Sequence, residues 1–118
     1  MSSLVTQELW DKYCNVKSSG NAKWTLARAI NTGVTNPSSF VGCHVGDCES
    51  YDDFKELFYP VIERYHNLKV EECVHVTDMD PSKIKIDLSE SAKSKVISTR
   101  IRVGRNLKAF PLNPGGTK

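Results

Sequence analysis

"SYDDFKELFYPVIERYHNL", residues 50–68, carries the strongest structural signal in the sequence. Its apolar residues recur at the spacing of a helix that turns one face toward a core. These residues are Phe54, Leu57, Phe58, Val61, Ile62 and Tyr65. Ser50 and Asp53 have the spacing of a capping box, with aspartate in place of the usual glutamate. Pro60 removes a backbone donor, so we expect a kink or two short helices that meet at residues 59–60.

Two more helices are expected on the amino-terminal side of this stretch. In GNAKWTLARAINTG, residues 20–33, Asn21 can cap a helix that ends at Gly33. Its apolar stripe consists of Ala22, Leu26, Ala29 and Ile30. Residues 6–16 predict a shorter helix with Thr6 as its N-cap. The sequence therefore predicts a mainly α-helical chain.

A long loop separates the two stronger helices. It reads GVTNPSSFVGCHVGDCE, residues 33–49, and its glycine, asparagine and proline residues favour turns over regular structure. Loops of this length in compact chains are usually functional or disordered. Phe40 and Val41 near the tip are apolar, which a merely solvated loop does not need. We therefore expect a functional loop.

The remainder of the chain predicts a linker and one strand. Residues 67–95 are polar and carry no helical stripe. In VISTRIRVGR, residues 96–105, apolar and polar residues alternate as in a β-strand, which places Arg100 and Arg102 on one face about 7 Å apart. A single strand needs a partner. It either pairs with KIKIDL, residues 83–88, or opens a second domain, and we favour the second.

Composition and charge exclude several classes. The chain has 118 residues, 39% hydrophobic and 25% charged, which is typical of one globular domain. No apolar run reaches the length of a membrane span, and no secretory signal is visible at the start. We therefore expect a cytoplasmic protein with reduced cysteines. Residues 1–90 carry 9 basic and 14 acidic residues, whereas residues 91–118 carry 7 basic residues and no acidic one, so this last quarter should face an anion.

Two of these stretches resemble the phosphagen kinases, the ATP:guanidino phosphotransferases. STRIRVGRNLKAFPLNP, residues 98–114, resembles the segment that opens their catalytic domain. The stretch from the loop into the third helix, residues 31–66, resembles their small helical N-terminal domain with its guanidino-specificity loop. The resemblance covers about the first third of such an enzyme. It implies a helical N-terminal domain with linker over residues 1–90, then the truncated start of the α+β catalytic, ATP-binding domain over residues 91–118.

The resemblance also implies an activity. Such an enzyme reversibly transfers the γ-phosphoryl group of MgATP to a guanidino substrate and so buffers cellular ATP. The implied partners are that substrate, ATP and the C-terminal catalytic domain. The resemblance places Arg100, Arg102 and Ser98 against the nucleotide phosphates, where guanidinium groups can bind phosphate oxygens bidentately. Catalytic carboxylates would lie beyond residue 118, so we expect no direct ligand to magnesium and no activity from these residues alone.

For the guanidino substrate, the resemblance implicates the loop. Backbone amides near its tip would hold the substrate's acidic group, because consecutive N–H groups in a turn form an anion-binding concavity. The corresponding residues are Ser39, Phe40, Val41 and Gly42, with His44 beside the substrate. The loop is as short as in arginine kinases. However, His44 replaces a tyrosine, Phe40 a glycine and Ser38 an acidic residue, so arginine and taurocyamine both remain open.

Other readings of the sequence stay open or are disfavoured. Cysteine and histidine residues recur in CHVGDC and CVH, but their spacing fits a tetrahedral zinc site poorly, so we expect no metal. The basic C-terminal face alone would also suit a stand-alone anion-binding, nucleic-acid-binding or protein-interaction module. Phe110 is the only aromatic residue there that could stack on a base, so we expect no nucleic acid partner and no membrane partner.

Overall fold

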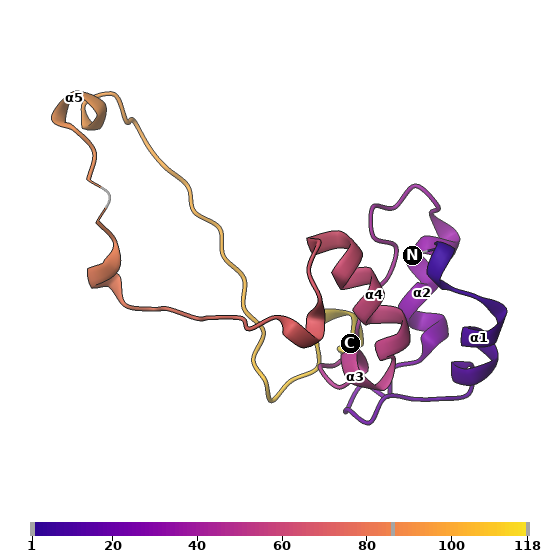
Figure 1. Cartoon of the computed structure of the whole chain (residues 1–118). Helices are drawn as coiled ribbons and strands as arrows, with labels where there is room; N and C mark the ends of the chain where they lie inside the picture. Colours follow the sequence, from indigo (N-terminus) through magenta and orange to yellow (C-terminus); the bar gives the residue numbers. More distant parts are fainter. Residues whose placement is uncertain (1, 86, 118) are drawn as a thin grey trace. The chain divides into compact units, whose positions relative to one another are not determined.

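The computed structural model describes residues 2–85 and 87–117, and it divides into two compact units (Figure 1). The described residues of 1–73 and 106–118 form the first unit. Residues 74–105 form the second. The chain therefore leaves the first unit after Cys73 and returns to it at Asn106.

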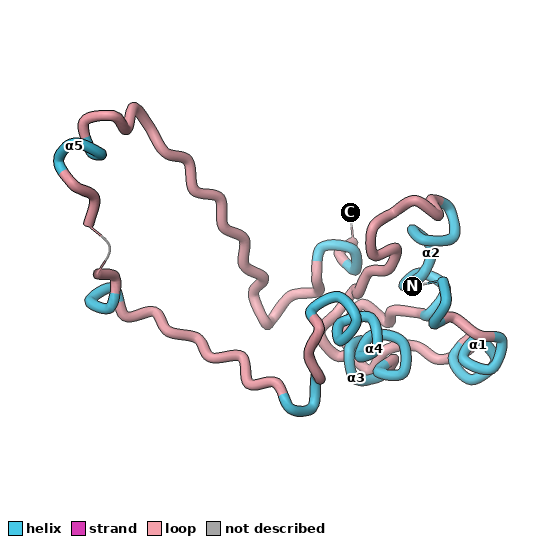
Figure 2. Tube along the Cα trace, turned by 45° about the horizontal axis from the view of Figure 1, so that its top comes forward, coloured by secondary structure: helices cyan, strands magenta, loops and turns pink. Residues whose placement is uncertain are grey.

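The first unit is built from helices and turns. Its α-helices are α1 (Gln7–Tyr13), α2 (Leu26–Thr35), α3 (Ser50–Asp53) and α4 (Lys55–His66). Its 3₁₀ turns are Ser2–Leu4, Val70–Glu72 and Asn113–Gly115. Across the described residues, Figure 2 shows helices and loops but no strand, and one isolated bridge joins Lys17 to Thr25. The prediction of a mainly helical chain is confirmed.

The starts of α1 and α2 are set by threonine caps. Thr6 Oγ1 accepts a hydrogen bond from the Leu9 amide at 3.2 Å, as the sequence predicted. In α2 the cap is Thr25, whose Oγ1 accepts from the Arg28 amide at 3.3 Å. The expectation that Asn21 caps this helix is wrong, because the chain turns through residues 20–24 and Lys23 has a positive φ of 46°.

The end of α2 also differs from the prediction. Gly33 does not end the helix, since α2 continues to Thr35 and the Asn36 amide still bonds to the Thr32 carbonyl at 2.9 Å. The Gly33 amide instead donates to the Gly42 carbonyl at 2.8 Å. Gly33 therefore lies inside α2 and contacts the loop through its backbone, and it is not the helix terminator.

The third helical stretch breaks earlier than expected. The interruption falls at Phe54 (φ −116°, ψ 37°), and α4 then runs through Pro60. The expectation that two short helices meet at residues 59–60 is therefore wrong. The capping box between Ser50 and Asp53 is also absent, because the carboxylate of Asp47 accepts from the backbone amide of Ser50 at 3.1 Å. The buried side chain of Asp47, from the preceding loop, thus caps α3 in place of the predicted pair.

One apolar core holds the first unit together. Leu26, Phe54 and Leu57 are almost fully buried, and the rings of Tyr13 and Phe54 meet edge to face with centroids 5.6 Å apart. The remaining members are Leu9, Trp24, Ala29, Ile30 and Phe58. The predicted stripe is thus buried through Phe58, but Tyr65 at its far end is 56% exposed. Full burial of a large apolar side chain contributes about 1.5–3 kcal/mol.

Residues 106–117 pack on the helical unit. The Leu112 amide donates to the Gly46 carbonyl at 2.9 Å, and Gly115 is buried. A Cβ atom at Gly115 would collide with the Gly46 carbonyl oxygen and approach Ala22. The domain boundary between residues 90 and 91 concerns the longer kinase and stays a prediction.

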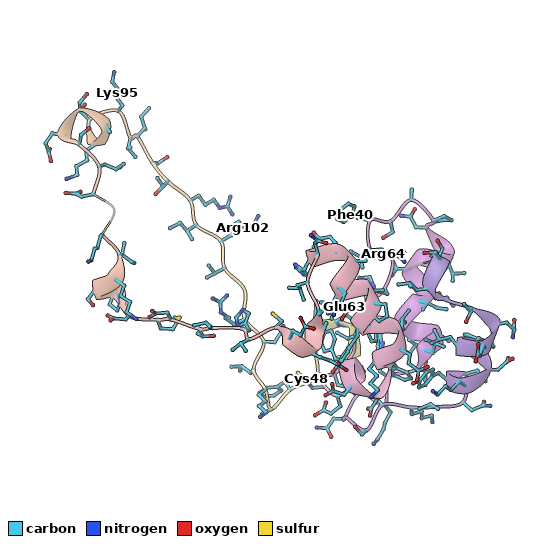
Figure 3. The ribbon with its side chains drawn as sticks, in the orientation of Figure 1. Phe40, Cys48, Glu63, Arg64, Lys95 and Arg102 are labelled. Atoms are coloured by element: carbon cyan, nitrogen blue, oxygen red, sulfur yellow. The ribbon has the colours of Figure 1, made fainter. Side chains whose placement is uncertain are left out.

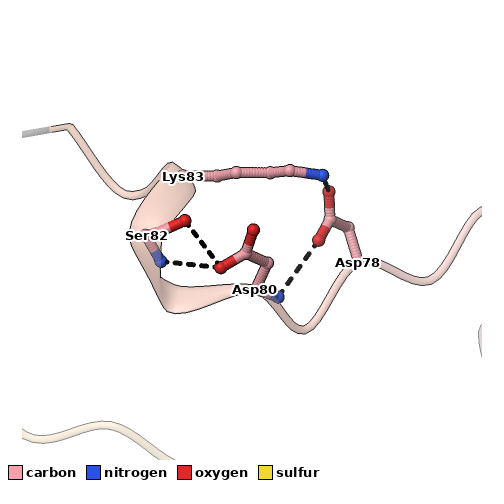
Figure 4. A network of polar contacts seen from close by, with 4 residues as sticks. All are labelled: Asp78, Asp80, Ser82 and Lys83. Atoms are coloured by element: carbon pink, nitrogen blue, oxygen red, sulfur yellow. Dashed lines mark hydrogen bonds and ion pairs between the residues drawn. The ribbon is translucent and has the colours of Figure 1, made fainter.

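The second unit, residues 74–105, contains a 3₁₀ turn (Pro81–Lys83) and the short helix α5 (Glu90–Lys93). Figure 4 shows how the turn is held: the Asp80 amide donates to Asp78, and Ser82 donates to Asp80. Lys83 also pairs with the Asp78 carboxylate. These are exposed local bonds, so the turn is organised by neighbours in sequence rather than by a core.

The strand expected over residues 96–105 is not formed in the described chain. Ile97 and Ile101, on its intended apolar face, are 99% and 85% exposed. The possible partner KIKIDL is not in strand at residues 83–85 and 87–88, and residue 86 lies outside the described residues. An alternating sequence forms a ladder only beside another strand, and the described residues supply none.

Candidate functional site

The loop between α2 and α3 is anchored along α2. The His44 amide donates to the Ala29 carbonyl at 2.9 Å, and the Trp24 indole Nε1–H donates to the His44 carbonyl at 3.0 Å. Gly42, which accepts from Gly33, has a φ of 76° that L side chains rarely adopt. The second half of the loop is therefore held in place by α2 and by Trp24 just before it.

The tip of the loop, residues 38–42, leaves several backbone donors available. The Ser39 amide already bonds to the Asn36 carbonyl at 2.9 Å. Within the described residues, the amides of Phe40, Val41 and Gly42 have no acceptor. The Phe40 side chain is 87% exposed and meets the Tyr65 ring edge to face at a centroid distance of 5.6 Å. Figure 3 shows Phe40 at the tip of this loop, with Arg64 labelled on α4.

His44 and Val41 are brought to one cavity. This cavity of about 370 Å³ lies between the loop, α4 and residues 106–114, and its lining includes Cys43, Tyr51 and Phe58. Phe40 instead lines a smaller hollow of about 170 Å³ with Val41 and Tyr65. Among the predicted loop residues, Val41 therefore connects the two hollows.

The His44 imidazole is exposed and positioned by one contact. Its Nδ1 atom lies 3.0 Å from Thr32 Oγ1, on the second turn of α2. On that side it lines a further hollow of about 510 Å³, which we call the α2 hollow, together with Arg28, Asn31 and other residues. Sequence reasoning missed Arg28. The signal that could have found it is the closeness of Trp24 and Arg28 in the sequence, since an aromatic ring just before a helix can meet a cation on its first turn.

Sequence reasoning also missed Asp47, a residue of the loop that is only 3% exposed. Its carboxylate accepts from Ser18 Oγ at 2.6 Å, from the Ala22 amide at 3.1 Å, and from the amide and hydroxyl of Ser50. Burial raises the pKa of Asp47, but these hydrogen bonds together outweigh it and leave the pKa below its ordinary value. The spacing of Asp47 and Ser50 at a helix start was the available signal.

The cysteines of the loop are free thiols. Cys43 is half-buried, and burial raises its pKa, whereas Cys48 is exposed (Figure 3). No three His, Cys, Asp or Glu side chains are placed to hold a metal ion in the part of the chain that the structure describes.

The predicted nucleotide-binding residues lie in the second unit. Ser98, Arg100 and Arg102 are all exposed on the extended segment that follows α5. Figure 3 shows the Arg102 side chain projecting from this segment. Neither arginine has an acidic partner within ion-pair distance among the described residues. Both guanidinium groups are therefore accessible.

Comparison with known proteins gives one consistent family. A family model described as "ATP:guanido phosphotransferase, N-terminal domain" matches residues 1–63. An arginine kinase of Stichopus japonicus is 41% identical over 114 residues, which cover 97% of this chain and 30% of that protein. An arginine kinase of Anthopleura japonica is 45% identical over 94 residues, 80% of this chain and 13% of that protein.

A third relative, an arginine kinase of Plodia interpunctella, is 36% identical over 119 residues, which cover 97% of this chain and 32% of that protein. The chain thus spans about a third or less of the length of these curated relatives. No helix formed by residues 2–85 and 87–117 is both long and apolar enough to cross a membrane. The helical fold and the family match agree, and the chain belongs to the ATP:guanido phosphotransferase, or phosphagen kinase, family.

Proposed function

We propose that this chain is the N-terminal part of a cytoplasmic guanidino kinase that buffers ATP by reversible transfer of the γ-phosphoryl group of MgATP. The acceptor is the guanidino group of arginine or taurocyamine. The observation that carries the proposal is the anchored loop with the unpaired amides of Phe40, Val41 and Gly42. The similarity to arginine kinases over nearly the whole chain supports it.

On the substrate side, the loop supplies backbone donors. Three consecutive amides without acceptors can surround one acidic group, and the positive φ of Gly42 gives the chain the required curvature. Ser39 supports the turn through its bond to the Asn36 carbonyl. His44, fixed by Thr32, would stand beside the bound substrate. In this proposal the loop binds the acidic end of the substrate and orients its guanidino group for transfer.

On the nucleotide side, Arg100 and Arg102 bind the phosphates, with Ser98 as an additional donor. Phosphoryl transfer depends mainly on positioning and on neutralising charge spread over the transferred oxygens. Guanidinium groups suit this role because they are always charged and match phosphate oxygens bidentately. Magnesium bound with ATP would supply positive charge against the phosphates, and we assign no residue of this chain as its direct ligand.

The identity of the substrate can be tested at His44 and Phe40. In the full-length enzyme, the double change His44→Tyr and Phe40→Gly should raise the preference for arginine over taurocyamine by about tenfold or more. The reason is that both side chains stand at the loop that receives the acidic group, and tenfold corresponds to about 1.4 kcal/mol of differential binding. The measurement is the ratio of kcat/KM for the two substrates, together with the KM for ATP.

Cys48→Ser provides the control, because Cys48 is an exposed residue of the same loop that lines neither the 370 Å³ cavity nor the 170 Å³ hollow. It should leave the substrate ratio and the KM for ATP unchanged. A double variant that altered ATP binding but kept the original substrate ratio would contradict the role of the loop in specificity.

A further inference from the structure

We infer that the α2 hollow binds the oxyanion group of a small organic molecule. The hollow has a volume of about 510 Å³, within the range of small-ligand sites. Its walls come from α2, from His44 and from the docked C-terminal segment. It is lined by Trp24, Ala27, Arg28, Asn31, Thr32, His44 and Pro114. Residues 39–42 do not line it, and the residue it shares with the proposed substrate loop is His44. The inference therefore does not rest on the backbone amides that carry the proposed function.

Arg28 is the principal anchor for an anion. Its guanidinium carbon lies 4.2 Å from the centre of the Trp24 ring, in the geometry of a cation–π contact. No acidic side chain lies within ion-pair distance of Arg28 in residues 2–85 and 87–117. The charge is therefore held in a defined position by stacking and is not already neutralised. A planar guanidinium group presented in this way can bind two oxygens of one phosphate or carboxylate group.

The other polar side chains of the hollow can add hydrogen bonds. Asn31 and Thr32 follow Arg28 at i+3 and i+4, so all three lie on one face of α2. The contact between Thr32 Oγ1 and His44 Nδ1 orients the imidazole and leaves its Nε2 atom without a partner in the described chain. No aspartate or glutamate lines the hollow. The local charge therefore favours an anion over a cation.

The apolar part of the lining indicates that the ligand has a body as well as an acidic group. Trp24, Ala27 and Pro114 provide this surface. The hollow of about 510 Å³ is also much larger than a bare phosphate ion needs, since a single water molecule takes up about 30 Å³. A guanidinium group such as that of Arg28 can bind either phosphate or carboxylate oxygens. The expected ligand is therefore a compact organic molecule that carries an oxyanion group.

NMR spectroscopy of the 118-residue chain can test this site with phenyl phosphate and benzoate as probes. The Trp24 indole N–H is the reporter, because it donates to the His44 carbonyl at the edge of the hollow. Trp10, on α1, is the internal control. At about 0.15 M salt, which screens unspecific attraction, phenyl phosphate should shift the Trp24 signal saturably and leave the Trp10 signal unchanged. A matching response to benzoate assigns oxyanions in general, whereas a response to phenyl phosphate alone assigns phosphate esters.

Three variants make the test specific. Arg28→Gln should weaken binding by about tenfold or more, since charge-assisted hydrogen bonds are lost. Arg28→Lys should weaken it less. Asn31 is exposed, so Asn31→Asp should preserve the fold. It should abolish binding, because it places a carboxylate in the hollow. Arg64→Gln removes the same charge from α4, outside the hollow, and should leave binding within about twofold.

The inference is overturned if neither probe shifts the Trp24 signal at tens of millimolar concentration. It is also overturned if Arg28→Gln binds as well as the unchanged chain, or if Arg64→Gln loses affinity to the same extent. Because the test measures binding to this chain and no kinase activity, its failure leaves the proposed function untouched. Failure of the substrate-preference experiment would equally leave this site untouched.

Discussion

At the scale of single residues, Asp47 illustrates how a buried charge can organise a loop. A carboxylate removed from water is costly unless hydrogen bonds replace the lost solvation. Asp47 has four such donors, contributed by Ser18, Ala22 and Ser50. These donors come from the turn before α2 and from the first residue of α3. The charge therefore joins two segments that are more than twenty residues apart.

Replacing Asp47 by asparagine should lower the free energy of unfolding by about 1–3 kcal/mol at neutral pH. An amide keeps the shape of the side chain but places an NH₂ group where one oxygen accepts hydrogen bonds. Urea unfolding followed by tryptophan fluorescence measures the effect. Asp11→Asn is the control, because Asp11 is exposed, and it should change stability by less than about 0.5 kcal/mol.

Asp47 should also shape the acid unfolding of the chain. Because its pKa is lower in the folded state than in the unfolded state, its contribution is fully present well above about pH 3.9, the ordinary value for aspartate. That contribution decreases as the pH falls through the folded-state pKa. Stability should therefore fall less steeply in acid for Asp47→Asn than for the unchanged chain. Equal slopes in the two proteins would contradict the assigned role.

At the scale of elements, the docking of residues 106–117 depends on one small residue. Gly115 lies so close to Gly46 and Ala22 that even a methyl group has no room. Gly115→Ala should therefore displace the segment and reduce stability by about 1–3 kcal/mol, the range for overpacked sites. Equilibrium unfolding in urea gives the value. Gly104→Ala is a matched control, since a Cβ atom there meets no neighbour within 4 Å, and it should leave stability unchanged.

The segment over residues 96–103 carries exposed apolar side chains as well as the two arginines. Ile101 is 85% exposed, so Ile101→Ala should change the stability of this chain by no more than about 0.5 kcal/mol. An apolar face with no sheet to cover cannot contribute burial energy. Burial of Ile101 would require a partner strand. Thermal unfolding of the 118-residue chain checks this prediction.

Arg100 and Arg102 should behave differently in the full-length kinase. Changing either one to alanine should lower phosphoryl transfer by about 100-fold or more, because one preorganised donor to developing charge contributes roughly 3 kcal/mol. Lysine should restore only part of the activity, since it keeps the charge but loses the bidentate fork. The check is kcat measured beside thermal stability. If the variants retained full activity per folded molecule, the assignment of both arginines to phosphate binding would be contradicted.

At the scale of the whole molecule, the two units should differ in local stability. The first has a continuous apolar core, whereas residues 74–105 bury almost no side chain and are held by local bonds. Amide exchange should therefore be slow in α2 and α4 and fast throughout 74–105. Trypsin should cut first within 74–105, where seven lysine and arginine residues are exposed. Early cleavage within α2 instead would contradict this division.

Local patterns in the sequence determined the helical fold. The spacing of Phe54, Leu57 and Phe58 predicted the buried face of the third helical stretch, because the helical period is a property of neighbouring residues. Thr6 was correctly predicted as a cap, because capping also depends only on residues close in the sequence. The family motifs in residues 31–66 and 98–114 predicted the phosphagen kinase family, and the comparisons agree. The assigned site residues in these motifs remain predictions.

Only the tertiary structure decided features that depend on distant contacts. The helix breaks at Phe54, whose side chain is fully buried in the core, and α4 runs through Pro60. The start of α3 is held by the buried side chain of Asp47, itself bonded to the distant Ser18, rather than by a capping box. Residues 106–117 pack at Gly46, and the α2 hollow exists because Arg28, His44 and Pro114 meet across the fold. Residues 96–105 form no strand, because a ladder needs a second strand and the described residues supply none. Periodicity records what a segment favours by itself, whereas packing space and hydrogen-bond partners come from residues far away in the chain.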